Sequence, residues 1–163
     1  MRRTLAIAGA VTAVALSAAP AAEADEPQIT HKTPISFDQF DTTSCSFPFH
    51  EIGDGFQTRT VFVDENGTPT RIRTHVNIDG IAVNEATGKT AQLQENLVID
   101  TRLEAGERTW SGIRIKATMP GGGALLIDVG RVLFDTATGE VIFEAGQHQL
   151  IHEDFADFCT AMG

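Results

Sequence analysis

The chain contains no tyrosine, one tryptophan and few basic residues, and these shortages narrow what it can bind. Carbohydrate-binding surfaces stack sugar rings on exposed tryptophan or tyrosine, and Trp110 alone offers little of that. The 12 lysines and arginines stand against 22 aspartates and glutamates, which gives a net charge of −10. A surface of that charge repels phosphate backbones and anionic lipid surfaces. We therefore expect no binding to nucleic acid or to a membrane surface.

Long apolar runs are also missing, except at the start of the chain. Met1–Thr4 is basic, Leu5–Ala19 is almost entirely apolar, and Ala22–Ala24 is a small-x-small cleavage site. This order predicts a signal peptide over residues 1–24 that is removed in the mature protein. The apolar run is shorter than the about 20 residues that a membrane-spanning helix needs. We expect a secreted, extracellular protein whose mature chain has no membrane span.

Cysteine is scarce, with only Cys45 and Cys159 in the chain. In an exported protein two such cysteines are expected to form a disulfide bond, which here would join the start of the domain to its end. The alternative is a pair of free thiols, but neither cysteine has a basic neighbour in sequence that would activate it. Four phenylalanines flank the pair and suggest a local hydrophobic cluster: Phe47, Phe49, Phe155 and Phe158.

Turn signals and alternating apolar residues predict an all-β domain. Residues 25–44 are polar and are expected to form an irregular N-terminal arm, whereas residues 45–163 are expected to form one β domain closed by the disulfide. The dipeptide Asn66–Gly67 is a hairpin signal, and Thr70–Ile78 alternates with a period of two, as a half-buried strand does. Ala124–Phe134 is nearly continuous apolar sequence and predicts the most buried strand.

These segments together predict a single antiparallel barrel, or a sandwich, of about 6–8 strands with a short C-terminal helix or coil. We favour the barrel, because consecutive hairpins suit up-and-down order and closure removes exposed strand edges. The pattern by itself distinguishes a barrel from a sandwich poorly.

Catalytic signatures are missing from the sequence. None of Ser36, Ser44, Ser46 and Ser111 lies in a G-x-S-x-G elbow. His148 and His152 have the spacing of two metal ligands on a helix. On a strand, however, the same spacing separates them by about 13 Å. We therefore expect no metal site and no cofactor.

The most informative polar residues lie inside the apolar hairpin near the end of the chain. A three-residue loop at Ala137–Gly139 would place Val132 opposite Glu144, whereas a slip of one residue would pair Arg131 with Glu144. Asp128, Glu144 and His148 are the weak catalytic candidates of this sequence. With Arg131 they would either line a cavity inside the barrel or decorate its outer face, and alternation leaves both possibilities open.

Several of these segments resemble a group of small exported actinobacterial β-rich proteins of unassigned function. The resemblance covers nearly the whole mature chain and implies the β fold and the disulfide. It carries over no catalytic residue, because its motifs are turns, strand patterns and cysteines. The segments are Cys45–Pro48, Asn66–Ile72, Thr87–Thr90, Gly122–Val132 and Asp157–Cys159.

Three functions are compatible with such a domain. The first is a non-catalytic barrel that binds a small, partly apolar molecule, since small barrels offer a lined interior. The second is a barrel-type cyclase or isomerase that uses Asp128, Glu144 and His148. The third is a cell-surface or structural interaction protein recognised through its acidic face. The sequence does not give the oligomeric state.

Overall fold

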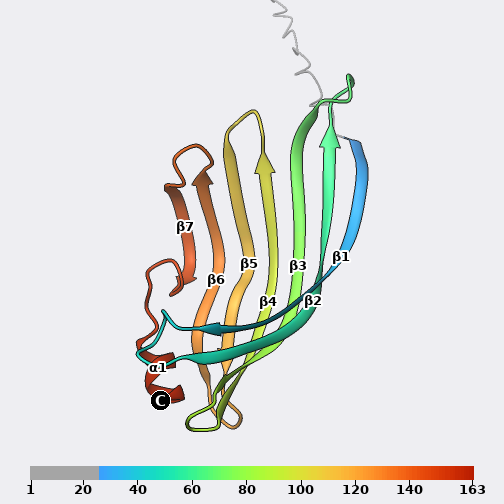
Figure 1. Cartoon of the computed structure of the whole chain (residues 1–163). Coiled ribbons are helices and arrows are strands. Elements are labelled where there is room, and N and C mark those ends of the chain that lie inside the picture. Colours follow the sequence, from blue (N-terminus) through green and yellow to red (C-terminus); the bar gives the residue numbers. More distant parts are fainter. Residues whose placement is uncertain (1–25) are drawn as a thin grey trace, which may run out of the picture.

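The computed structural model describes residues 26–163, in which seven strands form one antiparallel sheet and a short helix follows (Figure 1). The expected all-β fold with a C-terminal helix is confirmed. The predicted signal peptide over residues 1–24 lies outside the described residues. The elements are β1 (Glu26–Asp41), β2 (Phe49–Val63), β3 (Pro69–Asn84), β4 (Lys89–Arg102), β5 (Glu107–Thr118), β6 (Ala124–Asp135), β7 (Val141–His148) and α1 (Ala156–Met162).

The sheet is a meander that stays open. Each strand pairs with its neighbours in sequence, and β1 and β7 form the two edges, so the sheet is not closed into the favoured barrel. Strands β1 and β2 bend and run across one end of the sheet towards α1 (Figure 1). Within the part of the chain that the structure describes, no helix has the length and apolarity needed to cross a membrane.

The expected irregular arm over residues 25–44 is wrong for most of its length. Glu26–Asp41 forms β1 and pairs with β2 along its whole length, from Glu26 opposite Val63 to Asp41 opposite Phe49. The sequence of β1 is polar and lacks strict alternation, and its residues 30–41 are largely exposed on both faces. Its conformation depends on hydrogen bonding to β2 rather than on the preferences of its own residues.

The turns between strands follow the sequence signals. Gly67 has φ of 80°, as the Asn–Gly signal predicts, and Asp64 Oδ1 accepts hydrogen bonds from the backbone of Asn66 at 2.9 Å and Thr68 at 2.8 Å. Glycine adopts this left-handed backbone conformation easily, because it has no Cβ atom to clash. Tight turns of this kind keep consecutive strands adjacent and produce the meander order.

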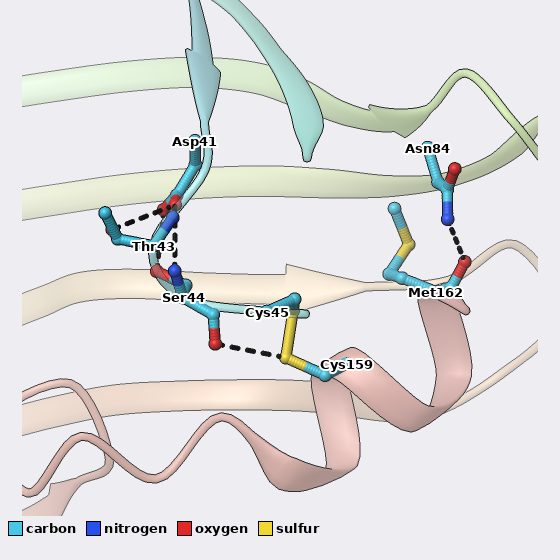
Figure 2. The surroundings of a disulfide bond; sticks show 7 residues. All are labelled: Asp41, Thr43, Ser44, Cys45, Asn84, Cys159 and Met162. Carbon is cyan, nitrogen blue, oxygen red and sulfur yellow. Dashed lines mark hydrogen bonds between the residues drawn. A yellow bond between two sulfur atoms is a disulfide. The ribbon is translucent and has the colours of Figure 1, made fainter. Parts of the chain in front are cut away.

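The hydrophobic core lies at the end of the sheet that α1 covers. Phe49 of β2 meets Phe158 of α1 edge to face, with ring centroids 5.2 Å apart. Asn84 Nδ2 donates a hydrogen bond of 3.0 Å to the Met162 carbonyl, so the end of α1 is tied to β3 (Figure 2). We call this region the sealed end; its buried members are Phe49, Ala82, Ala91, Leu93, Ala117, Leu126, Phe158 and Met162.

The disulfide bond of the sealed end links two cysteines that are 114 residues apart in sequence. Cys45 and Cys159 are bonded, with their Cα atoms 5.5 Å apart (Figure 2), as expected from the sequence. Asp41 holds the segment before Cys45 by accepting hydrogen bonds from the backbone of Thr43 at 2.7 Å and of Ser44 at 2.9 Å. The 3.4 Å approach of Cys159 Sγ to the Ser44 carbonyl is a contact only, because a bonded sulfur carries no hydrogen. The two remaining flanking rings, Phe47 and Phe155, pack against the core as expected.

Candidate functional site

One face of the sheet continues from the sealed end and carries the candidate site. We call it the inner face. It is the face that carries Glu51, Ala82 and Ala91, which lie side by side on the paired strands β2, β3 and β4. A hollow of about 300 Å³ lies on this face between the bent strands β1 and β2 and the surface of β4 and β5. Its lining residues are Phe37, Gln39, Glu51, Ile78, Leu93, Gln94, Glu95 and Ile115.

The polar groups of the hollow are two carboxylates and two amides. Gln39 Nε2 donates a hydrogen bond of 3.0 Å to Glu51 Oε2, which joins β1 to β2. Burial raises the pKa of Glu95, and the nearby charge of Arg114 partly opposes this rise. A carboxyl group that is costly to ionise lies beside apolar walls, so the hollow offers both apolar contact and hydrogen bonding.

Next along the inner face, Asp128 of β6 and His148 of β7 face each other and are 2 % and 6 % exposed. The Oδ1 atom of Asp128 lies 3.2 Å from His148 Nδ1, and Oδ2 accepts a 3.1 Å hydrogen bond from the Leu150 backbone. Because an ionised carboxylate only accepts hydrogen bonds, Asp128 selects the histidine tautomer protonated at Nδ1. In the neutral imidazole, the other ring nitrogen, Nε2, then carries a free lone pair.

Arg114 joins this pair through an irregularity in β5. The register of β5 shifts between Ile113 and Ile115 against β6, and between Ile113 and Lys116 against β4, which is a β-bulge. The guanidinium of Arg114 therefore lies over the Trp110 ring, 4.4 Å from its centroid, and its Nη1 atom is 3.9 Å from Asp128 Oδ2. Burial lowers the pKa of Arg114, while the charges of Asp128 and Glu95 oppose this.

A small cavity of about 10 Å³ separates these side chains. Two buried nitrogens of its lining residues, Trp110 Nε1 and His148 Nε2, have no hydrogen-bond partner within residues 26–163. Buried polar atoms of this kind are rare in folded proteins and call for an explanation. We call this region the Trp–His cavity; its lining residues are Leu97, Trp110, Gly112, Arg114, Asp128, Gly130, Val132 and His148.

The structure brings together two of the three catalytic candidates. Val132 lies opposite Glu144, as the three-residue loop predicts, and the alternative pairing of Arg131 with Glu144 is wrong because Arg131 lies opposite Ala145. Glu144 is exposed and contacts His152, whose Nε2 atom is 3.3 Å from the Glu144 Oε1 atom. His148 and His152 thus have different partners, and no group of three or more metal-ligating side chains is found among the described residues.

The sequence did not point to Glu95 of the hollow, or to Trp110 and Arg114 of the Trp–His cavity. Alternation alone places Ile113 and Ile115 on one face and Arg114 on the other, whereas the bulge moves Arg114 to the inner face beside Asp128. The available signal was Gly112, since a glycine inside a strand often marks a bulge.

Comparisons with models of protein families, with curated proteins and with solved structures give no match for this chain. The resemblance to small exported actinobacterial proteins therefore stays a prediction.

Proposed function

We propose that this protein is an exported, non-catalytic binding protein that holds a small, partly apolar molecule in the hollow of its inner face. One observation carries the proposal, namely a hollow of about 300 Å³ whose exposed surface is mainly apolar and which also offers four polar side chains. Sites for small molecules have this composition and volumes from about 300 to 1,000 Å³. The hollow suits a compact ligand at the lower end of that range.

The arrangement of the walls supports a binding role. Phe37, Ile78 and Ile115 come from three strands and supply apolar surface, while Glu51 and Glu95 can orient a polar group of the ligand. The hollow borders a further apolar space near α1, and the two share Glu51, Leu93 and Ile115 as lining residues. A ligand with an apolar body and one polar end fits this distribution.

Export is supported by two features. The start of the chain has the order of a secretory signal peptide, and the paired cysteines are typical of oxidising compartments. An extracellular binding protein of this kind would meet its ligand outside the producing cell.

The test uses the neutral fluorophore N-phenyl-1-naphthylamine, titrated into the purified mature protein. We expect a saturable rise in emission, because the probe leaves water for an apolar hollow. The variant Ile78→Trp fills the hollow and should weaken binding at least about tenfold, which corresponds to about 1.4 kcal/mol.

The matched control is Ile52→Trp. Ile52 is 38 % exposed and lies next in sequence to Glu51, so its side chain points to the opposite face. This variant should bind the probe as the parent protein does. No saturable binding by the parent protein, or equal binding by both variants, would contradict the proposal.

A further inference from the structure

Two lining residues of the Trp–His cavity, Trp110 and His148, each carry a buried nitrogen without a hydrogen-bond partner among residues 26–163. Trp110 Nε1 carries a hydrogen and can only donate. In the neutral imidazole, His148 Nε2 can only accept, because the contact with Asp128 places the single ring proton on Nδ1. Both atoms are buried and lack a partner within residues 26–163. A group that satisfies both must accept one hydrogen bond and donate another, and a hydroxyl group does this.

The size of the cavity limits the group further. Its volume of about 10 Å³ corresponds to the space of about one water molecule. A hydroxyl group fits such a space, whereas a carboxylate, a phosphate or a ring does not. The same group would remove the cost of leaving the two nitrogens unpaired.

The surface beside the cavity leaves room for the rest of a ligand. Gly112, Gly130 and Gly146 lie side by side on β5, β6 and β7 and form a strip of the inner face without side chains. Gly112 and Gly146 are exposed. Gly130 has φ of 142°, and a Cβ atom there would lie 2.1 Å from the Ala145 carbonyl oxygen, so a side chain at this position would displace the neighbouring strand.

We propose that Trp110 and His148 form a hydroxyl-binding site, filled by water in the free protein and by the hydroxyl group of a small apolar alcohol in the complex. The alcohol oxygen accepts a hydrogen bond from Trp110 Nε1, and its hydrogen is donated to His148 Nε2. The apolar body of the alcohol lies over the glycine strip. The site shares no lining residue with the hollow of the proposed function, and it goes beyond that function.

The first test compares cyclohexanol with cyclohexanone, which has nearly the same shape but no hydrogen to donate. Trp110 is the sole tryptophan of the chain, so its fluorescence reports on this site. Cyclohexanol should change the Trp110 fluorescence in a saturable way. It should bind at least about tenfold more tightly than cyclohexanone, because the ketone leaves the buried acceptor unpaired. In His148→Phe the two probes should bind about equally. In the control His152→Phe, where the altered histidine is exposed, the preference for cyclohexanol should persist.

A second measurement uses the unmodified protein and does not depend on the folding of a variant. The ¹⁵N shifts of the His148 ring should show the Nδ1-protonated tautomer, and a high-resolution crystal structure should show a water oxygen within hydrogen-bond distance of both nitrogens. The Nε2-protonated tautomer, a dry cavity, or equal or undetectable binding of the two probes would overturn the proposal. Binding of N-phenyl-1-naphthylamine that Ile78→Trp weakens reports on the hollow, which shares no lining residue with the Trp–His cavity, so failures of the two proposals are distinguishable.

Discussion

The sealed end and the Trp–His cavity are both buried, but they treat polar groups differently. At the sealed end the buried amide of Asn84 has a partner for both its nitrogen and its oxygen, since it donates to the Met162 carbonyl and accepts from the Ala86 backbone. In the Trp–His cavity, Trp110 and His148 each keep one nitrogen unpaired within the described residues. The first arrangement is that of a stable core, and the second is that of a site with capacity left for a ligand. Substitutions should therefore lower stability strongly in the first region and change binding in the second.

The largest effect is expected at Phe158, which is 2 % exposed and packs on Phe49. Phe158→Ala should lower the free energy of unfolding by about 3–5 kcal/mol, through lost burial and the cavity left behind. Chemical denaturation measures this change. The matched control is Phe143→Ala, because Phe143 is 48 % exposed and should change stability by no more than about 0.5 kcal/mol. Similar losses in the two variants would contradict the location of the core.

The disulfide should give the next largest effect. Replacing both Cys45 and Cys159 by serine should cost about 2–5 kcal/mol, because the bond restricts a long loop of the unfolded chain. The measurement is the denaturation midpoint of the double variant beside that of the parent protein with and without a reducing agent. The reduced parent protein and the double variant should agree, and no effect of reduction would refute the contribution of the bond.

Asp128→Asn should have a smaller effect on folding and a clear one on the Trp–His cavity. An amide has one acceptor oxygen, which can keep the Leu150 hydrogen bond, while its nitrogen can pair with His148 Nδ1 only as a donor, which requires the Nε2-protonated tautomer. Loss of the hydrogen bonds to a charged carboxylate should cost about 1–3 kcal/mol. The same change releases the His148 tautomer, so the preference for cyclohexanol over cyclohexanone should fall. Unchanged stability together with an unchanged probe preference would contradict the role given to Asp128.

Much of the fold follows from local signals, while the site depends on long-range placement. Glycine turns and alternating residues predict the hairpins, because a turn and its two strands are close in sequence. Strand β1 was missed because its pairing with β2, and not its own sequence, makes it extended. Asp128 and His148 could be proposed together from one hairpin, but Trp110 and Arg114 join them across another strand pair and through a bulge. Sequence alternation cannot show such a shift, although Gly112 marks its place.

The smallest effects are expected on the face opposite the hollow, where two charged groups should respond to pH in opposite directions. Burial alone would raise the pKa of Asp100, but hydrogen bonds from Arg71 and Arg73 outweigh it and the net shift is downward. Asp100 therefore stabilises the fold above the unfolded-state pKa of about 3.9, and this stabilisation is lost as pH falls through the lower folded-state pKa. Asp100→Asn should remove less than about 1 kcal/mol at neutral pH and less in acid.

His50 gives the opposite case. A hydrogen bond to Asp38 raises the pKa of His50, and Glu85 adds to this rise. The stabilisation of the fold by protonated His50 is complete below the unfolded-state pKa of about 6.5. It is lost as pH rises through the higher folded-state pKa. Thermal unfolding of His50→Gln across this range should converge with that of the parent protein at high pH. Divergence of the two curves with rising pH would contradict the sign.

The way α1 is joined to the sheet also sets an order of events in folding. Each hairpin of the meander brings together residues that are near in sequence, and such hairpins form within about 1–10 μs in isolation. The sealed end instead joins Asn84 to Met162 and Cys45 to Cys159, so it requires the closure of much longer loops. We expect the hairpins of the sheet to form first, starting at their turns, while α1 remains undocked. The disulfide bond should form only after docking brings the two sulfurs together. Until that late step the apolar surface of β4 to β6 stays uncovered, which makes the undocked intermediate the species most exposed to aggregation and proteolysis.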